Sequence, residues 1–169
     1  MTNSPLHSKP DVQLHVVMCG SMSALAEMES LADKLRQNGF RVTTPAPEER
    51  SLDWKMLDLE GAVARKREFL NDYFDVIRQG DIVLIANYRK HGVDGYIGAN
   101  SLMEAACGHA LGKPVVFLNS IGDQPCQLEA RAIAMGILKK LIRSRCLPFL
   151  QIREVADEPH RTDDRLSPP

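Results

Sequence analysis

The sequence lacks several features that mark whole classes of protein. No apolar run approaches the roughly 20 residues that a membrane-spanning helix needs. Aromatic residues make up only 5% of the chain, too few for a surface on which nucleic-acid bases stack. The net charge is -1, with no basic block. The N-terminal MTNSPLHSKPD has no apolar signal core. We therefore expect a cytoplasmic protein whose partners are neither nucleic acid nor membrane.

Metal and cofactor motifs are also missing. The four cysteines are widely spaced, with no C-x-x-C pair, and the five histidines are scattered. This pattern predicts reduced thiols rather than disulfides or a structural zinc site. Neither G-x-G-x-x-G nor G-x-x-x-x-G-K-[ST] occurs, so the usual dinucleotide and ATP fingerprints are absent. We expect no metal and no bound cofactor.

The chain is long enough for one domain. Its 169 residues are 44% hydrophobic and 25% charged, as in ordinary globular proteins. Residues 1–12 are polar and contain two prolines, and residues 156–169 are polar and charged. We expect a flexible arm over 1–12, a single folded domain over 13–155 and a disordered tail over 156–169.

Short apolar runs alternate with helical patterns along that domain. We expect five strands, at 14–19, 40–44, 81–86, 114–118 and, at an edge, 149–153. We expect helices at 23–38, 63–79, 101–111 and 128–143, and an irregular segment at 46–61. Such alternation predicts an α/β three-layer sandwich with a mostly parallel five-stranded sheet. Ligands bind beyond the carboxyl ends of such strands. Three loops, 20–23, 87–98 and 119–124, should therefore meet at the site.

A Gly-Ser turn follows the first strand, in the stretch MCGSMSALAEM. Backbone N–H groups there favour an anion, and the hydroxyl of Ser21 or Ser23 could add a donor. The alternative is a plain helix N-cap, a role that serine fills well. The residues alone leave both interpretations open.

Two acidic residues are candidates for catalysis. Ser101 and Glu104 fit the capping-box pattern S-x-x-E, which would explain Glu104 structurally. Alternatively, Glu104 faces the ligand crevice and attacks an electrophilic carbon such as a sugar C1′. Asp72 is either a solvated helix charge or a partly buried general acid at the crevice rim. Retaining glycosyl transfer needs two carboxyl groups about 5 Å apart, which this pair could supply.

The loop NYRKHGVDGYIGAN, residues 87–100, has the length of a lid or binding loop. Arg89 and Lys90 could hold a phosphate, and Tyr96 could stack on a base. Each could equally be a solvated surface residue. His109 and Cys107 lie on the following helix, and we interpret them as surface or packing residues.

Three stretches together resemble the nucleoside 2-deoxyribosyltransferase-like superfamily, which includes the 2′-deoxynucleoside 5′-monophosphate N-glycosidases. They are MCGSM, GDIVLIAN and GYIGANSLMEAACGHALGKPVVFLN. The resemblance covers about residues 14–119. It implies a flavodoxin-like or Rossmann-like fold, cleavage or transfer at an N-glycosidic bond, a nucleoside or nucleotide partner, and a homodimer or larger assembly whose neighbouring chain completes the site.

The resemblance also assigns roles by position. Glu104 matches the nucleophilic glutamate, and Asp72 lies near the position of the acid/base aspartate. Gly20 and Ser21 match the loop that cradles the sugar or its 5′-phosphate. Six residues before the nucleophile, the transferases carry Asp and the monophosphate hydrolases carry Ser, whereas this chain has Gly98.

The further candidates for substrate binding are Ser23, Asn87, Tyr96, Gly98 and Asn100. Asn100, Asp94 or a loop cation could make the contact that Gly98 lacks. Two other functions are also compatible with the sequence. One is hydrolysis of NAD, whose nicotinamide bond also suits a glutamate nucleophile. The other is a nucleotide-binding sensor without catalysis, which Gly98 favours.

Overall fold

The computed structural model describes residues 13–47 and 51–138. Within them the strands are β1 (His15–Gly20), β2 (Arg41–Thr43), β3 (Ile82–Ala86), β4 (Val115–Phe117) and β5 (Gly136–Ile137). The α-helices are α1 (Leu25–Gln37), α3 (Leu59–Gln79), α4 (Ala99–Ala110) and α5 (Gln127–Ile133). Two short 3-10 helices, η1 (Met22–Ala24) and η2 (Trp54–Met56), precede α1 and α3. Strands and helices thus alternate as predicted.

The five strands form one sheet in the order β2-β1-β3-β4-β5, and every pair is parallel. Val17 is paired with Val83, and Leu84 with Val116, so the middle of the sheet is in continuous register. The predicted α/β fold class is confirmed, and the order is flavodoxin-like. Strand order reverses between β1 and β3, where such sheets leave a crevice for a ligand.

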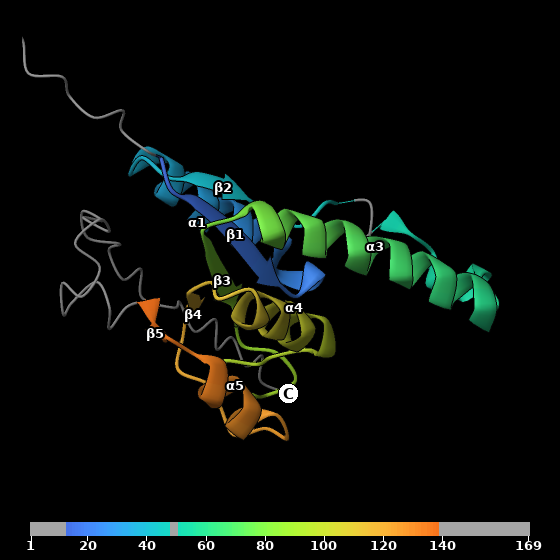
Figure 1. Cartoon of the computed structure of the whole chain (residues 1–169). Coiled ribbons are helices and arrows are strands. Elements are labelled where there is room, and N and C mark those ends of the chain that lie inside the picture. Colours follow the sequence, from blue (N-terminus) through green and yellow to red (C-terminus); the bar gives the residue numbers. More distant parts are fainter. Residues whose placement is uncertain (1–12, 48–50, 139–169) are drawn as a thin grey trace, which may run out of the picture.

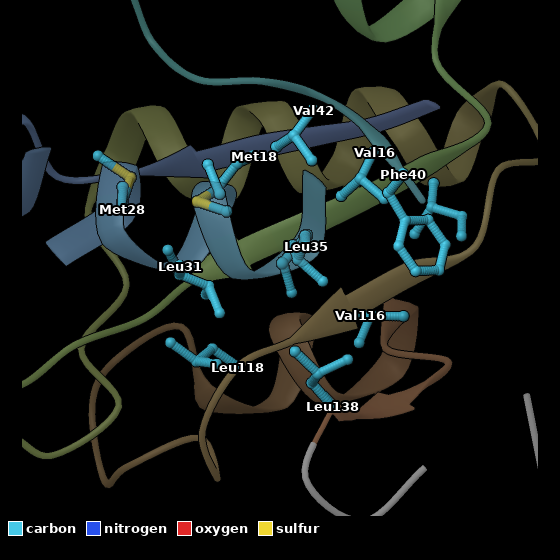
Figure 2. Close-up of a cluster of buried hydrophobic side chains, with 14 residues drawn as sticks. Val16, Met18, Met28, Leu31, Leu35, Phe40, Val42, Val116, Leu118 and Leu138 are labelled. Carbon is cyan, nitrogen blue, oxygen red and sulfur yellow. The ribbon is translucent and has the colours of Figure 1, made fainter. Parts of the chain in front are cut away.

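Alternate residues of each strand supply two separate cores. Val16 and Met18 of β1 face α1 together with Leu84 and Val116, and Met28, Leu31 and Leu35 of α1 pack on them (Figure 2). Val17 and Cys19 face the opposite layer with Ile85 and Phe117, against α3, α4 and α5. Because both faces are covered, β3 is buried over all five of its residues. The side chain of Cys19 therefore lies on the same side of the sheet as α4.

Helix α3 is longer than predicted. It begins at Leu59, because the carboxylate of Asp58 accepts a hydrogen bond of 2.7 Å from the backbone N–H of Gly61. The segment before it, expected to be irregular, contains η2. The N-terminal part of α3 extends away from the sheet (Figure 1), and Leu59 is 80% exposed there. Only the C-terminal part packs on the sheet, through Ile77.

The predicted helix over 128–143 is interrupted after Ile133, and its residues 139–143 lie outside the described part of the chain. Helix α5 ends at Ile133, and Ala134 has an extended backbone. The N–H of Met135 donates to the carbonyl of Val115 at 2.8 Å, which brings the chain onto the edge of the sheet. Gly136 and Ile137 then pair with β4 as the fifth strand. Apolar residues at this edge suit a strand as well as a helix, and the periodicity did not distinguish them.

Several predictions fall outside the described residues. These are the arm over 1–12, the edge strand over 149–153, the tail over 156–169 and the domain boundary at 155. Cys146 also lies outside them, and the other three cysteines are free thiols. Among helices within 13–47 and 51–138, none combines the length and apolar character needed to cross a membrane.

Candidate functional site

A cavity of about 570 Å³ opens at the carboxyl ends of the strands, on the side of α3 and α4. Eight residues singled out in the sequence as candidates for catalysis or binding line it: Gly20, Ser21, Asp72, Lys90, Tyr96, Gly98, Asn100 and Glu104. They come from the ends of β1 and β3 and from two helices. Residues more than 80 positions apart in the chain, such as Gly20 and Glu104, therefore share one wall. The volume suits a small organic ligand.

Glu104 is not a helix cap. Helix α4 begins at Ala99 with Gly98 at its N-cap, and no side chain caps it. Ser101 is the third helical residue and is 5% exposed. Glu104 is the sixth, too far along the helix to reach the cap N–H. The capping-box explanation is therefore wrong, and α4 begins two residues before the predicted start at 101.

The carboxylate of Glu104 lies in a buried setting. The residue is 8% exposed and lines the cavity. Cys19, at 0% exposed, lies close enough for the charge of Glu104 to act on its thiol. Burial, followed by that charge, raises the pKa of the Cys19 thiol well above its usual range. Burial of a carboxylate is costly, so its position at the wall of a cavity makes Glu104 a candidate functional group.

Tyr73 closes the floor of the cavity beside this pair. Its hydroxyl donates a hydrogen bond to the backbone carbonyl of Met18. Burial raises the pKa of Tyr73 well above its usual range, and the charge of Glu104 acts in the same direction. Tyr73 is therefore a neutral phenol whose proton is already committed to the backbone. It shapes the floor without supplying a proton to the cavity.

Asp72 precedes Tyr73 on α3 and also lines the cavity. The residue is exposed rather than partly buried, which corrects the expected burial at the rim. The rim position itself agrees with the expectation. The solvated carboxyl of Asp72 and the buried carboxyl of Glu104 thus line the same cavity in different surroundings. Such a difference in surroundings is what allows two carboxyl groups to act separately as acid and nucleophile.

The end of the cavity near β1 offers hydrogen-bond donors and a cation. The amine of Lys90 donates to the hydroxyl of Ser21 at 2.8 Å, and the hydroxyls of Ser21 and Ser23 lie 2.9 Å apart. Ser21 is at the N-cap of η1 but makes no capping hydrogen bond with its side chain. The simple cap interpretation of Ser21 is therefore wrong. Its hydroxyl instead takes part in a cluster of donors that could bind an anion.

Gly20 is needed for close packing at this end. A side chain there would come within 2.8 Å of the Met28 sulfur and 3.1 Å of the carbonyl of Ala86. Ser23 is exposed and lines a smaller neighbouring hollow, together with Ser21 and Lys90, rather than the main cavity. Ser23 therefore reaches the site only through its contact with Ser21.

Asn87 has a structural role. It is 2% exposed and does not line the cavity. Its amide donates to the carbonyl of Asn119 at 3.0 Å and accepts from the N–H of Asn119 at 2.9 Å. Gln124 fixes the same loop by accepting a 2.8 Å hydrogen bond from the N–H of Ile97. The loop over 119–124, expected to contact the ligand, instead supports the loop over 87–98.

Within the supported loop, only some side chains face the cavity. Lys90 and Tyr96 line it, and the ring of His91 packs edge-on against Tyr96, with centroids 5.3 Å apart. Arg89 is exposed and pairs with Asp94 at 3.5 Å, so it does not contribute to this wall. His109 is exposed and Cys107 is half-buried, consistent with surface and packing roles.

Two parts of the wall were not predicted. One is the end of β2 and the segment after it, whose lining residues are Thr43, Thr44, Pro45 and Ala46. The other is a face of α3, with lining residues Arg65, Phe69, Leu70, Tyr73 and Val76 in addition to Asp72. The neighbouring position of β2 and β1 in the sheet explains the first. The spacing of Phe69, Tyr73 and Val76 on one helical face could have indicated the second.

No protein-family model and no curated protein matches the chain. A solved structure of a 2-deoxyribosyltransferase from Bacillus psychrosaccharolyticus matches 71% of this chain and 82% of its own, with a TM-score of 0.51 and 17% identity. The CMP N-glycosidase BcmB of Clostridium botulinum matches 72% of this chain and 84% of its own, with a TM-score of 0.43 and 12% identity. The first match confirms the resemblance at the level of the fold; the second is too distant to carry an argument.

Proposed function

We propose that the chain is an enzyme that breaks the N-glycosidic bond of a nucleoside 5′-monophosphate, with Glu104 as the nucleophile. The observation that carries the proposal is a buried carboxylate and an exposed one, Glu104 and Asp72, lining one cavity. The shared fold with a 2-deoxyribosyltransferase supports the same chemistry.

The cavity offers a place for each part of such a substrate. The hydroxyl of Ser21 and the amine of Lys90 would bind the 5′-phosphate, because both are donors that suit a phosphate oxygen. The sugar would lie over Glu104, near the carboxyl end of β1. Tyr96 and Phe69 would contact the flat base, since aromatic faces stack on any nucleobase. The phosphate donors favour a monophosphate over an uncharged nucleoside.

The reaction would proceed in two steps. A Glu104 oxygen attacks C1′, forming a C–O bond while the C1′–N bond breaks and its electron pair leaves with the base. Asp72 in its protonated form gives the base a proton, so that a neutral base departs. Asp72 then takes a proton from water, which attacks C1′ and releases the sugar phosphate and Glu104. A second base in place of water would give transfer instead of hydrolysis.

We propose further that a second copy of the chain completes the site. Met56 of η2 and Leu59 at the N-terminus of α3, the end that extends from the sheet, are 81% and 80% exposed. Such apolar side chains are typical of a surface covered in an assembly. A particle mass from light scattering equal to two chains or more is expected, and a monomer at micromolar concentration would contradict this part of the proposal.

A substrate panel tests the function. Nucleosides, their 5′-monophosphates and NAD are each incubated with the protein, and released base is measured by chromatography. We expect base release from a monophosphate, and its loss in Glu104→Ala and Glu104→Gln while both variants remain folded by circular dichroism. Because Gln keeps the size and polarity of Glu, the second variant separates chemistry from packing.

Other results on the same panel would identify a different function. Release of nicotinamide from NAD alone would indicate an NAD hydrolase. Binding of a nucleotide in calorimetry, with no product from any substrate, would indicate a sensor. Base release at an unchanged rate in Glu104→Gln would exclude the proposed nucleophile.

A further inference from the structure

Arg65 lines the cavity but has no part in the reaction described above. It lies on α3, eight residues before Tyr73, whose hydroxyl is bonded to a carbonyl of β1. At about 1.5 Å per helical residue, Arg65 is about 12 Å along the helix axis from Tyr73. Since this part of α3 extends away from the sheet (Figure 1), Arg65 marks the outer end of the cavity.

Two contacts hold the guanidinium of Arg65 at this wall. Its carbon Cζ lies 4.7 Å from the centroid of the Phe69 ring, which also lines the cavity. Its nitrogen Nη1 pairs with the carboxylate of Glu68, which does not line the cavity. Within 13–47 and 51–138, no hydrogen bond or ion pair engages Nη2 or Nε of Arg65. The guanidinium therefore keeps donors for a ligand.

The two cations of the cavity wall lie at different ends. Among the described residues that line the cavity, the cationic side chains are those of Lys90 and Arg65. Lys90 is bonded to Ser21, just after β1, where the 5′-phosphate would bind. A nucleotide held by its phosphate at that end and by its sugar over Glu104 would direct its base outward along α3. The outer edge of the base would then face Arg65.

A guanidinium distinguishes the common bases by the atoms on that edge. Arginine has five N–H donors and no acceptor. Guanine and hypoxanthine present the acceptors O6 and N7, and uracil and thymine present O4, whereas adenine and cytosine carry an amino group at the corresponding position. Arginine donates hydrogen bonds to an oxo base, but against an amino base its N–H groups would meet other N–H groups.

We propose that Arg65 selects substrates whose base is a 6-oxopurine or a 4-oxopyrimidine over those that carry the corresponding amino base. The inference rests on the proposed function and names the substrate class of that site. Phe69 contacts the flat face of the base, and the guanidinium of Arg65 donates to its carbonyl oxygen. Arg65 is thus a specificity-determining residue that touches the base and not the reacting atoms.

Other polar groups of the wall are already engaged or lie elsewhere along it. The hydroxyl of Thr44 donates to a carboxylate on α1, and the hydroxyl of Thr43 is bonded to the histidine of β1. Asp72 lies about two helical turns closer to the sheet than Arg65, and the proposed reaction uses it at the glycosidic bond. Substitution of Arg65 leaves these three groups in place.

Matched nucleotides test the selection. Inosine and adenosine 5′-monophosphates differ at position 6 of the base, and uridine and cytidine 5′-monophosphates differ at position 4. The value of kcat/KM for base release is measured for each pair, with ribose and with 2′-deoxyribose. In the wild type we expect the oxo member to be preferred about tenfold, in the lower part of the range for an arginine contact because the side chain is 49% exposed. In Arg65→Met, which keeps an apolar stem against Phe69, the preference should fall below about twofold.

Arg67→Met is the matched control. Arg67 is exposed on the same helix and does not line the cavity, so this variant loses the same charge from α3 and should keep the preference for the oxo base. Equal rates on both members of each pair in the wild type would overturn the proposal, as would an unchanged preference in Arg65→Met. An equal loss of preference in Arg67→Met would also overturn it, because net charge alone would then explain the effect. Circular dichroism checks that each variant is folded.

Binding to Glu104→Gln separates this inference from the proposed function. Calorimetry gives the Kd of inosine and adenosine 5′-monophosphates for Glu104→Gln, with and without Arg65→Met. We expect the inosine nucleotide to bind about tenfold more tightly in the single variant and the two to bind about equally in the double variant. Equal Kd values in the single variant would overturn the inference, even if the wild type releases base as proposed. A difference in Kd that depends on Arg65, with no base released by the wild type from any substrate, would instead refute the proposed function and leave the base selection established.

Discussion

Replacement of Lys90 by Met gives the sharpest test of which substrates the cavity accepts. The amine of Lys90 lies 2.8 Å from the Ser21 hydroxyl, and the residue is only partly exposed. Met keeps much of the apolar stem of lysine and removes the charge. The expected consequence is a selective loss of phosphate binding, with the shape of the wall retained.

The size of the loss follows from the contact. A hydrogen bond to a charged group contributes about 1.5–3 kcal/mol, and about 1.4 kcal/mol corresponds to a factor of ten. Since Lys90 keeps some contact with solvent, the lower part of that range applies. We expect kcat/KM for a nucleoside 5′-monophosphate to fall about tenfold to thirtyfold, mostly through KM. For the uncharged nucleoside, kcat/KM should change by less than about twofold.

The assay measures kcat/KM for both substrates in the wild type, Lys90→Met and Arg89→Met. Arg89 is the matched control, because this neighbouring cation is exposed, pairs with Asp94 and does not line the main cavity. Its removal should leave the preference for the monophosphate intact. Equal losses on nucleoside and monophosphate in Lys90→Met, or an equal loss of preference in Arg89→Met, would refute the assignment of the phosphate end.

Two further predictions concern stability and the wall of the cavity. Burial and the charge of Arg41 lower the pKa of His15 below its ordinary value of 6.5. The contribution of His15 to stability is therefore fully present above pH 6.5 and is lost as the pH falls through the lower pKa of the folded state. The urea-unfolding free energy should decline less between pH 7.5 and pH 5 in His15→Gln than in the wild type, and parallel curves would refute this. A side chain at Gly98 would meet only Tyr96, at 3.6 Å, and the φ of Gly98 is -80°. Gly98→Ser should therefore fold normally, gain a few tenths of a kcal/mol in the free energy of unfolding from helix capping, and bind the monophosphate more tightly. A decrease of more than about 1 kcal/mol in the urea-unfolding free energy, or a higher KM for the monophosphate, would contradict this prediction.

The geometry at His15 explains why its pKa is lowered. The guanidinium of Arg41 can only donate, so the His15 nitrogen Nδ1, at 2.6 Å from it, accepts. The other nitrogen, Nε2, then carries the proton and donates to the Thr43 hydroxyl at 2.8 Å. Protonation of Nδ1 would place its N–H group against the N–H groups of Arg41. The unfolded chain does not hold these two side chains together, so protonation has this cost only in the folded protein.

The sheet could be predicted from the sequence because its strands are short and apolar on both faces. Val83 and Ile85 face one core and Leu84 the other, so β3 has no polar position at which a helical pattern could arise. The binding of ligands beyond the carboxyl ends of parallel strands then predicts that Gly20 and Glu104 lie at one crevice. The parts of the fold that follow from strand periodicity and chain order can therefore be predicted from the sequence.

The parts of the fold and of the site that depend on tertiary contacts could not be predicted from the sequence. Ser101 and Glu104 satisfy a capping pattern, yet the helix begins earlier, at Ala99, and the serine is buried inside it. Asn87 is polar and follows a strand, but its amide is used to hold Asn119. Cys19 and Glu104, whose charge acts on the Cys19 thiol, are 85 positions apart, and no spacing rule relates them.

The nucleophile can be identified directly by trapping the covalent intermediate. A 2′-deoxy-2′-fluoro nucleoside 5′-monophosphate, which destabilises the oxocarbenium-like transition state of the second step, is incubated with the protein, and the digested chain is analysed by mass spectrometry. The account predicts one added sugar phosphate on the carboxylate of Glu104 and none in Glu104→Gln. A modified residue elsewhere, or release of base at a measurable rate with no adduct on any residue, would contradict it.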